Sequence, residues 1–389
     1  MPGLIWRILA VVLAMMTFGA NRVQHLSTGP HLPPGEGFIA GHYRAQRGPI
    51  LSPPAPEATT NASVYALLDN IRHTPPGATI RIVAYSFSIM PVADALIAAQ
   101  RRGVHVQLVV DGRHSHAFEA AQAVQGALGA DRTHDSFLVL TDRSARGLVS
   151  HTHQKSWSFS RTGSSRHVVM VGSTNLSILG TTGQYSDMYS FVDRPDVWHA
   201  FSGVFRAQAR DRPVPDPAVT DDLGRDTAYF DPGFSMANDP IADLIGQLPA
   251  RPSTHIRIVM FAWHPPRGRH LVDLLLDKLE GGASVEIVRG PYVRQPLGRL
   301  VAAGASVHSG VFADGDVVHD KLMIADAVRH GRRERFVTTG SDNWGNVSFL
   351  RDDVDVRIGL GAGQYAAYVG YVDRLVQRGA SERRVSSRH

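Results

Sequence analysis

The sequence predicts an α/β fold made of two similar halves, and two observations support that class. Short runs rich in β-branched residues alternate with amphipathic stretches of about ten to fifteen residues, a pattern typical of β-α-β units. The segment IRIVAYSF at residues 80–87 also returns as IRIVMFAW at residues 256–263. We therefore expect each half to contain a largely parallel sheet with helices packed on it.

The elements of the two halves are expected in the same order: helix, strand, helix, strand. In the first half they are expected at residues 62–77, 78–88, 91–103 and 104–112. In the second half they are expected at residues 239–253, 254–264, 269–282 and 283–291. A further helix is expected at residues 197–210, before the Pro- and Asp-rich stretch DRPVPDPAVTDD.

Composition divides the chain into six segments. The first 20 residues combine a basic start that ends at Arg7, an apolar run and the small residues Gly19 and Ala20, which is typical of a cleaved export signal. A membrane anchor is the alternative, but Arg7 interrupts the apolar run early. The predicted division is a signal peptide at 1–20, a Pro/Gly-rich linker or arm at 21–56, an N-terminal domain at 57–212, a connector at 213–235, a C-terminal domain at 236–378 and a flexible basic tail at 379–389.

Composition also excludes some kinds of catalytic site and indicates the charge of the binding partner. A chain of 389 residues with 43% hydrophobic content is long enough for two globular domains. Because the chain has no cysteine, thiol catalysis and cysteine-bound zinc are excluded. The formal charge of +5 suits an anionic partner such as a phosphate-bearing lipid or a nucleic acid.

An H-x-K triplet occurs twice, at His153–Lys155 and at His319–Lys321. Only three of the 40 basic residues are lysines, and two of those three lie in these triplets. A compact ammonium is not interchangeable with a planar guanidinium in a packed site, so this placement predicts sites that require lysine itself.

Each triplet is followed by matched polar residues. The sequences GSTN at 172–175 and GSDN at 340–343 place their serines 20 and 22 residues after the histidines. Asp187 and Asp353 each stand 34 residues after a triplet histidine. Such sets suit phosphodiester chemistry, because histidine can act as nucleophile or acid while Lys, Ser and Asn donors hold phosphate oxygens.

The paired H-x-K and G-S-x-N motifs resemble those of the phospholipase D superfamily, and the likeness extends from about residue 57 to 380. The resemblance implies two pseudo-symmetric α-β-α sandwich domains, an active site at the cleft between them, and no metal or cofactor. It implies a secreted phosphodiesterase that hydrolyses glycerophospholipid head groups, or transfers them to alcohols, through a phosphohistidine.

Residue roles follow from the same resemblance. His153 is expected to be the nucleophile and His319 the acid, although the pseudosymmetry leaves an exchange of these roles open. Asp353 is expected to orient His153, and Asp187 to orient His319. The expected phosphate ligands are Lys155, Lys321, Ser173, Asn175, Ser341 and Asn343.

The two motif copies differ at one place. Five residues after the lysine, the second copy has the motif aspartate, Asp326, where the first has Ser160. The resemblance places Asp326 among the expected catalytic residues, with a supporting role in its loop and charge balance. Serine keeps hydrogen-bonding capacity but has no negative charge. We expect Lys155 to be less neutralised than Lys321, and the two histidines to titrate apart.

Three alternatives remain open at this point. A secreted nuclease of the same superfamily would use the same core on nucleic acid. A non-catalytic member would bind polyanions, with Ser160 as its support. A zinc hydrolase would need a third ligand besides an H-x-H pair such as His151 and His153. The expected partners are a phospholipid or membrane surface, or nucleic acid, and one chain, expected to be a monomer, should build a whole site.

Other histidines and aromatics receive plainer interpretations. His114 and His116 follow a strand end, where they could contact substrate. Trp157 and Phe159 are expected to pack in the core. His151, His167, His308 and His330 are expected to be surface or hydrogen-bonded residues, and an apolar rim that could meet acyl chains or bases is expected at Trp263, Trp344 and Tyr292.

Overall fold

The computed structural model describes residues 42–386, which belong to one compact unit. The predicted signal peptide at 1–20 and the first part of the predicted arm lie outside the described residues, as do residues 387–389. Within the described part of the chain, no helix is both long enough and apolar enough to cross a bilayer.

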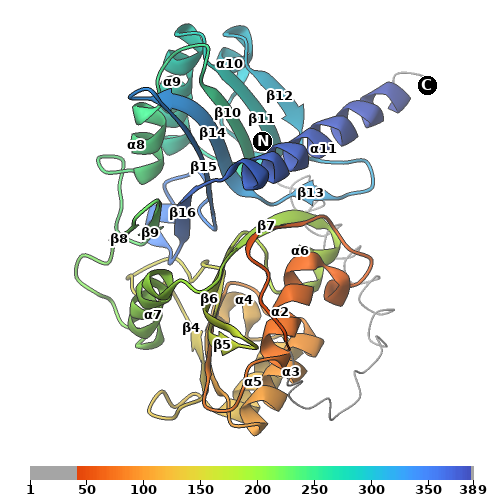
Figure 1. Cartoon of the computed structure of the whole chain (residues 1–389), viewed down its shortest axis with the longest axis vertical. Coiled ribbons are helices and arrows are strands. Elements are labelled where there is room, and N and C mark those ends of the chain that lie inside the picture. Colours follow the sequence, from red (N-terminus) through yellow and green to blue (C-terminus); the bar gives the residue numbers. More distant parts are fainter. Residues whose placement is uncertain (1–41, 387–389) are drawn as a thin grey trace, which may run out of the picture. The chain divides into compact units, whose positions relative to one another are not determined.

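The first half forms a sheet of mixed direction (Figure 1). Its strand order is β1-β7-β6-β5-β2-β3-β4, and the short strand β13 (Val317–Val318) of the second half pairs with β7. The strands are β1 Gly48–Ser52, β2 Thr79–Ala84, β3 His105–Asp111, β4 Phe137–Thr141, β5 Ser156–Thr162, β6 Ser165–Gly172 and β7 Gln184–Phe191. The helical segments are η1 Ala58–Thr60, α2 Ala62–Arg72, α3 Met90–Arg101, α4 Gly112–Ser115, α5 Glu119–Leu128, α6 Ile178–Thr182 and α7 Pro195–Ala209.

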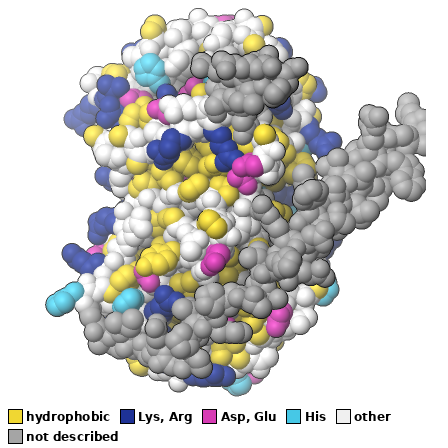
Figure 2. All heavy atoms as spheres, turned by 90° about the vertical axis from the view of Figure 1, so that its right-hand side faces the viewer, with side chains coloured by type: hydrophobic (Ala, Val, Ile, Leu, Met, Phe, Trp, Pro, Cys, Tyr) yellow, Lys and Arg dark blue, Asp and Glu magenta, His cyan; other side chains and the backbone are white. Residues whose placement is uncertain are grey.

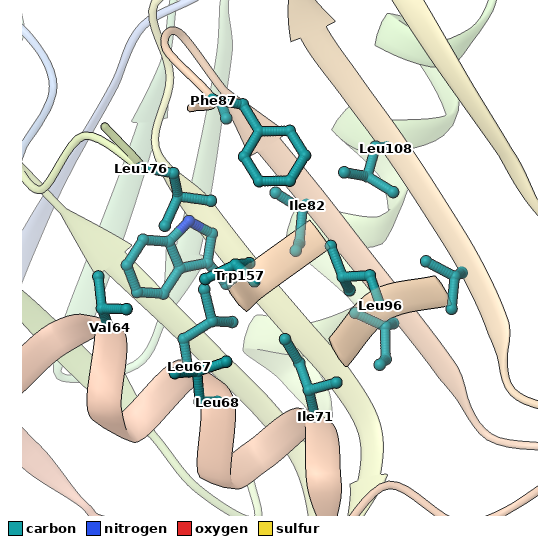
Figure 3. Packing of buried hydrophobic residues seen from close by; sticks show 14 of the residues in the cluster. Val64, Leu67, Leu68, Ile71, Ile82, Phe87, Leu96, Leu108, Trp157 and Leu176 are labelled. Carbon is teal, nitrogen blue, oxygen red and sulfur yellow. The ribbon is translucent and has the colours of Figure 1, made fainter. Parts of the chain in front are cut away.

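The spacing of apolar residues along α2 determines which face of this helix packs against the first sheet. Val64, Leu67 and Ile71 lie on one side of the helix, and all three side chains are fully buried. They pack with Trp157 of β5 in the core between α2, α3 and the sheet (Figure 3). The expectation that Trp157 and Phe159 are core residues is confirmed, because neither side chain is exposed.

The second half repeats this architecture. Its strand order is β12-β11-β10-β14-β15-β16-β9-β8. The strands are β8 Val219–Leu223, β9 Asp226–Phe230, β10 His255–Trp263, β11 Ser284–Val293, β12 Ser306–Ser309, β14 Lys321–Arg329, β15 Arg332–Gly340 and β16 Val354–Gly359. The helical segments are α8 Pro240–Gln247, α9 Arg267–Glu280, α10 Gly298–Ala302, η2 Ser348–Leu350 and α11 Ala362–Ser386. The predicted α/β class with two sheet-and-helix halves is confirmed.

The expectation of largely parallel sheets is wrong. Only β2-β3-β4 and β10-β11-β12 are parallel runs, and the following strands of each half are antiparallel. The reason is a tight hairpin after each H-x-K strand. Gly163 starts the β5–β6 turn at a φ of 52°, and His330 and Gly331 join β14 to β15 at φ values of 48° and 76°. Two positive φ values in a two-residue loop suit the right-handed twist of a hairpin.

One continuous hydrophobic core joins the two sheets. It contains Val169 and Val171 of β6, Phe201 of α7, Val356 of β16 and Tyr368 of α11. Because these side chains from both halves pack together, the two sheets hold a fixed relation within the compact unit.

Three segments of the predicted division contain more structure than the sequence suggested. The predicted arm contains β1, which pairs with β7. The predicted connector contains β8 and β9, which extend the second sheet. The predicted tail is helical as far as Ser386, because α11 continues through it. The domain limits themselves stay a prediction.

Candidate active site

Each H-x-K motif forms a backbone hydrogen bond with a residue of the other half. The amide of His153 donates to the carbonyl of Asp352 at 2.8 Å, and Thr152 forms a bridge with the same residue. In the equivalent place, the amide of His319 donates to the carbonyl of Tyr185 at 2.7 Å, directly after β13 pairs with β7. Both motifs therefore depend on both halves, and one chain supplies the complete arrangement.

Both motif histidines line one cavity of about 770 Å³. Asn175 and Asn343 line it as well, from the loops after β6 and β15. Their side-chain oxygens are buried and have no hydrogen-bond partner among residues 42–386. These oxygens are acceptors, and it is the NH₂ groups of the same two side chains that can donate to phosphate oxygens.

The two lysines lie behind the histidines rather than on the cavity wall. Lys155 Nζ donates to the carbonyl of His153, and Lys321 Nζ donates to the carbonyl of His319 at 2.5 Å. Lys321 Nζ is also 3.1 Å from both ring nitrogens of His319. The lysines thus place positive charge beside the histidines, which favours an anion in the cavity.

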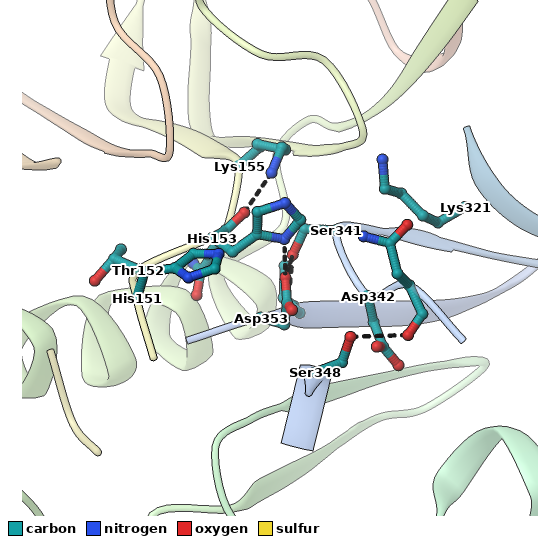
Figure 4. Close-up of polar contacts among 12 residues, drawn as sticks. His151, Thr152, His153, Lys155, Lys321, Ser341, Asp342, Ser348 and Asp353 are labelled. Atoms are coloured by element: carbon teal, nitrogen blue, oxygen red, sulfur yellow. Dashed lines mark hydrogen bonds and ion pairs between the residues drawn. The ribbon is translucent and has the colours of Figure 1, made fainter. Parts of the chain in front are cut away.

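His153 has a carboxylate partner, as expected. Its Nδ1 is 2.7 Å from Oδ1 of Asp353, whose same oxygen accepts a hydrogen bond from Ser341 Oγ at 2.5 Å. Figure 4 shows the imidazole between Lys155 and Asp353, with Lys321 across from it. With Nδ1–H donating to the carboxylate, the lone pair of Nε2 is left for the cavity.

The expected pairing of Asp187 with His319 is wrong. Nδ1 of His319 donates to the carbonyl of Ser173 at 3.1 Å. Asp187 is fully buried and accepts hydrogen bonds from Ser173 Oγ at 3.0 Å, Thr339 Oγ1 at 2.6 Å and the hydroxyl of Tyr368 at 3.4 Å.

The cause is a one-residue offset between sequence spacing and strand register. Asp352 and Tyr185 are equivalent, because each accepts from a motif histidine amide. The residue after Tyr185 is Ser186, so a serine stands in the place that Asp353 occupies in the other half. Successive strand residues face opposite ways, and the equal spacing of 34 residues therefore matched the wrong position.

The two G-S-x-N serines do not line the cavity, contrary to expectation. Both are fully buried. Ser173 Oγ donates to Asp187, and Ser341 Oγ donates to Asp353. They hold the carboxylates behind the site instead of contacting a ligand.

Burial and nearby positive charges lower the pKa of both motif histidines. Burial, then the charges of Lys155, Arg351 and Lys321, hold the pKa of His153 well below its usual value of 6.5. Burial, then the charges of Lys321 and Lys155, hold the pKa of His319 well below that value too. Burial brings the pKa of Lys155 to about 7 and lowers that of Lys321 well below its usual value. At neutral pH both imidazoles are neutral, which leaves a nitrogen lone pair on each ring.

Anion binding should weaken as pH rises above neutrality. Lys155, with a pKa of about 7, is charged at pH 6 and neutral at pH 9, so a bound anion must draw in a proton at the higher pH. Sulfate keeps a constant charge over this range, and its Kd should rise at least about tenfold between pH 6 and pH 9. Titration calorimetry measures the change. A Lys155→Gln variant should flatten the profile, and a constant Kd in the unmodified protein would contradict the charge assignment.

The motif aspartate lies outside the site. Asp326 is five residues along β14 from Lys321, and its carboxylate accepts hydrogen bonds from Arg333 and Arg335 at 2.7 and 3.1 Å. Burial would raise the pKa of Asp326, but these arginines hold it below its usual value. Ser160 Oγ accepts from the amide of Thr79 at 2.8 Å.

Each of these residues therefore supports its own sheet. The expectation that Ser160 leaves Lys155 less neutralised than Lys321 is wrong, because neither Ser160 nor Asp326 contacts a motif lysine. The pKa of Lys321 is lowered chiefly by burial and then by the charge of Lys155, and that of Lys155 is lowered chiefly by burial.

Asp326→Ser should lower stability more than activity. The change removes three charged hydrogen bonds and should reduce the free energy of unfolding by roughly 1–3 kcal/mol, with turnover kept within about tenfold. Ser160→Asp, the matched change in the first half, keeps an acceptor for Thr79 and should preserve turnover within about tenfold. Denaturant unfolding and initial rates measure both. Equal and severe losses of turnover would mean that these positions act on the site.

The structure also identifies cavity residues that the sequence interpretation missed. His151 was expected to be a surface or hydrogen-bonded residue, but it lines the cavity, with its ring 5.5 Å from that of His153. Tyr85 and Phe261 line it too, and their rings lie 4.9 and 4.4 Å from those of His153 and His319. The repeated segments IRIVAYSF and IRIVMFAW carry an aromatic at this shared position, which was the available signal.

Predictions for other aromatics and histidines had mixed outcomes. Trp263 and Trp344 are buried against each other, with ring centroids 4.6 Å apart, so they form no apolar rim. Tyr292 does line the cavity and is partly exposed. Of the two strand-end histidines, His114 lines the cavity whereas His116 is not among its lining residues. Across residues 42–386, no three His, Asp or Glu side chains are arranged to hold a metal ion.

Comparisons with known proteins agree with this geometry. Residues 67–208 match the family model described as "Cardiolipin synthase, PLD-like domain", a region that contains the first H-x-K motif and its G-S-x-N sequence. No curated protein sequence matches the chain significantly.

Two solved structures share the fold. Phosphatidylserine synthase from Haemophilus influenzae Rd KW20 has a TM-score of 0.56 and 12% identity, over 81% of this chain and 84% of the synthase chain. Polyphosphate kinase from Porphyromonas gingivalis has a TM-score of 0.54 and 16% identity, over 90% of this chain. This chain spans 52%, about half, of the kinase's length. Residues 67–208 thus match a PLD-like domain model, and the two sheet-and-helix halves share their fold with the phosphatidylserine synthase structure.

Proposed function

We propose that this protein is a phospholipase D-type phosphodiesterase that cleaves the head-group ester of glycerophospholipids through a phosphohistidine at His153. The observation that carries the proposal is an unequal pair of histidines in one cavity. His153 has a carboxylate at Nδ1, whereas His319 has a backbone carbonyl oxygen and no carboxylate there.

The different Nδ1 partners of the two histidines suit them to different roles in the first step, His153 as nucleophile and His319 as acid. Nε2 of His153 forms a bond to phosphorus, and the ring gains positive charge that Asp353 stabilises. The bond from phosphorus to the head-group oxygen breaks, and that oxygen takes a proton from His319. Without a carboxylate, the protonated ring of His319 is the stronger acid. Phosphate binding supplies the negative charge that favours protonation of His319 beforehand.

The second step reverses the proton transfer. Neutral His319 removes a proton from water while the water oxygen bonds to phosphorus and the bond to His153 breaks. The product is phosphatidic acid. A primary alcohol can take the place of water, and the product is then a phosphatidyl alcohol. Lys155 and Lys321 stabilise the growing negative charge from behind, and the amides of Asn175 and Asn343 donate to phosphate oxygens.

Apolar side chains at the cavity mouth favour a lipid substrate. Leu179, Val347 and Tyr292 line the cavity and are exposed by 61%, 51% and 38%. Figure 2 shows hydrophobic side chains gathered across the middle of one face, with Lys and Arg side chains near them. Exposed apolar groups next to cations suit an anionic lipid surface.

A nuclease is the second candidate, and one observation favours it. A separate cavity of about 550 Å³ in the first half is lined by several arginines, which suits a sugar–phosphate backbone. The arginines are Arg81, Arg132, Arg206, Arg210 and Arg212.

One assay separates the two candidates. The purified protein is incubated with vesicles of mixed phospholipid head groups and, separately, with labelled single-stranded DNA. Phosphatidic acid release without DNA cleavage supports the proposal. DNA cleavage without phosphatidic acid would replace it with the nuclease, and a His153→Ala control should abolish whichever activity is present.

We also propose that residues 1–20 direct export and are removed. Their composition supports this proposal. Protein sequencing of the material outside the expressing cells should start close to residue 21. Retention of the whole chain in the cell would contradict it.

A further inference from the structure

Arg351 presents an uncompensated positive charge to the cavity. It follows η2 and lines the cavity two residues before Asp353. Its Nε is buried without a hydrogen-bond partner. Its guanidinium takes part in no ion pair among residues 42–386. An unpaired cation on a cavity wall is costly to desolvate, so the site favours an anionic ligand beside it.

The charge of Arg351 acts on groups from both halves. It lowers the pKa of His151 and His153 in the first half and that of His264 in the second. His264 lines the same cavity. The guanidinium therefore lies on the same cavity wall as His153 and close to groups from both halves.

The cavity wall carries no compensating acid. Its lining residues include Arg294 and Arg351 but no aspartate or glutamate. The carboxylate of Asp353, behind the wall, is already bonded to His153 and Ser341. One phosphodiester anion between the histidines is matched by the lysines behind them, which leaves the arginines for a second negative group.

A cationic head group has no comparable place. Recognition of a quaternary ammonium relies on carboxylates or on open aromatic faces. The faces of Tyr85 and Phe261 are already occupied by Lys155 Nζ at 5.3 Å and Lys321 Nζ at 4.8 Å. The remaining aromatic ring of the lining, Tyr292, stands two residues from the cation Arg294. Choline alone is thus a poor match for this cavity.

We infer that Arg351, assisted by Arg294, forms a subsite for a second anionic group, a carboxylate or a further phosphate, on the head group of the phospholipid substrate. This inference rests on the proposed function and names the class of lipid that the same site prefers. Arg351 forms the inner part of the subsite, and Arg294 lies exposed at its outer edge.

A matched pair of substrates tests the subsite. Dihexanoyl phosphatidylserine and dihexanoyl phosphatidylethanolamine differ by one carboxylate, and both release phosphatidic acid. They are compared as monomers, which removes any effect of a lipid surface. The unmodified protein should have a kcat/KM at least about tenfold higher for the serine lipid, since a hydrogen bond to a charged group contributes about that much.

Substitution of Arg351 isolates its contribution. Arg351→Gln should reduce the serine-to-ethanolamine ratio to below about threefold, and Arg351→Lys should restore part of it. Arg113→Gln is the matched control. Arg113 is an exposed cation that donates to the carbonyl of Ser150 and does not line the cavity, so its loss should leave the ratio unchanged. Because the ratio compares two substrates of the same variant, it stays informative when a variant has a lower kcat/KM for both lipids.

Failure of the inference and failure of the proposed function have different signatures. Equal cleavage of the two lipids by the unmodified protein, or an unchanged ratio in Arg351→Gln, overturns the subsite and leaves the function intact. Cleavage of neither lipid, with cleavage of an oligonucleotide, overturns both.

Discussion

His153→Ala should abolish turnover, with a fall of roughly 10⁴-fold or more on every phosphodiester substrate, since removal of a covalent nucleophile has effects of this order. The measurement is kcat on two soluble substrates, one with an alkyl leaving group and one with p-nitrophenol. His116→Ala is the control, because His116 is exposed and is not among the lining residues of the cavity. Residual turnover of more than a few per cent would exclude His153 as the nucleophile.

His319→Ala should separate the two substrates. An alkyl leaving group needs a proton, and its loss should slow by roughly 10²–10⁴-fold without the general acid. p-Nitrophenolate leaves without protonation, so its first release should be much less affected. Equal slowing of this first release on both substrates would mean that His319 does more than transfer protons.

Asp353→Asn should have the second large effect, acting through His153 rather than on the substrate. The amide can still accept from Nδ1, but the negative charge that stabilises the positively charged ring is lost. We expect kcat to fall by roughly 10²–10⁴-fold, as for a neutralised partner of a catalytic histidine.

The pH profile distinguishes positioning from damage to the fold. A carboxylate favours protonated His153, so its removal should lower the pKa of that histidine further and shift the acidic limb of kcat/KM to lower pH. Asp187→Asn is the matched control, because Asp187 is equally buried but bonds to Ser173, Thr339 and Tyr368. It should keep turnover within about tenfold. Equal losses of turnover in the two variants would mean that the carboxylate of Asp353 has no special role at His153, and would contradict the unequal roles of the two histidines.

Much of the fold could be predicted from the sequence, because its signals are local or repeated. The alternation of strands and helices and the duplicated IRIV segments predicted two similar sheets, and both are present. Strand direction was not predicted correctly, because the hairpin residues Gly163 and His330–Gly331 were not interpreted as turns. The strands β8 and β9 were missed because they lie in a Pro- and Asp-rich stretch.

Site residues that are recognised by their type within a motif were predicted correctly. Residues whose position depends on strand register were predicted less well. The motif histidines, lysines and asparagines all gather at one place. Asp187 was misassigned because a different loop length shifts strand register by one residue, which counting along the sequence does not reveal. Asp326 was misassigned because five residues along an extended strand separate it from the lysine by about 16 Å.

Arg351 had no sequence signal at all. It is one of many arginines in the chain, and only the fold reveals that it lines the cavity with its Nε unpaired among residues 42–386. Its significance depends on what the neighbouring residues lack, namely a carboxylate on the cavity wall. Such an absence is visible only when residues distant in sequence are brought together.

Trapping of the covalent intermediate tests the division of labour between the histidines most directly. His319→Ala is mixed with an excess of a p-nitrophenyl phosphodiester, quenched at high pH and digested, and the peptides that contain residues 153 and 319 are examined by mass spectrometry. Loss of p-nitrophenol needs no acid, whereas hydrolysis of the intermediate needs a base. The account therefore predicts a rapid release of about one equivalent of p-nitrophenol and a stable phosphoryl adduct on His153. An adduct on His319 in a His153→Ala variant, with none on His153 in His319→Ala, would contradict it.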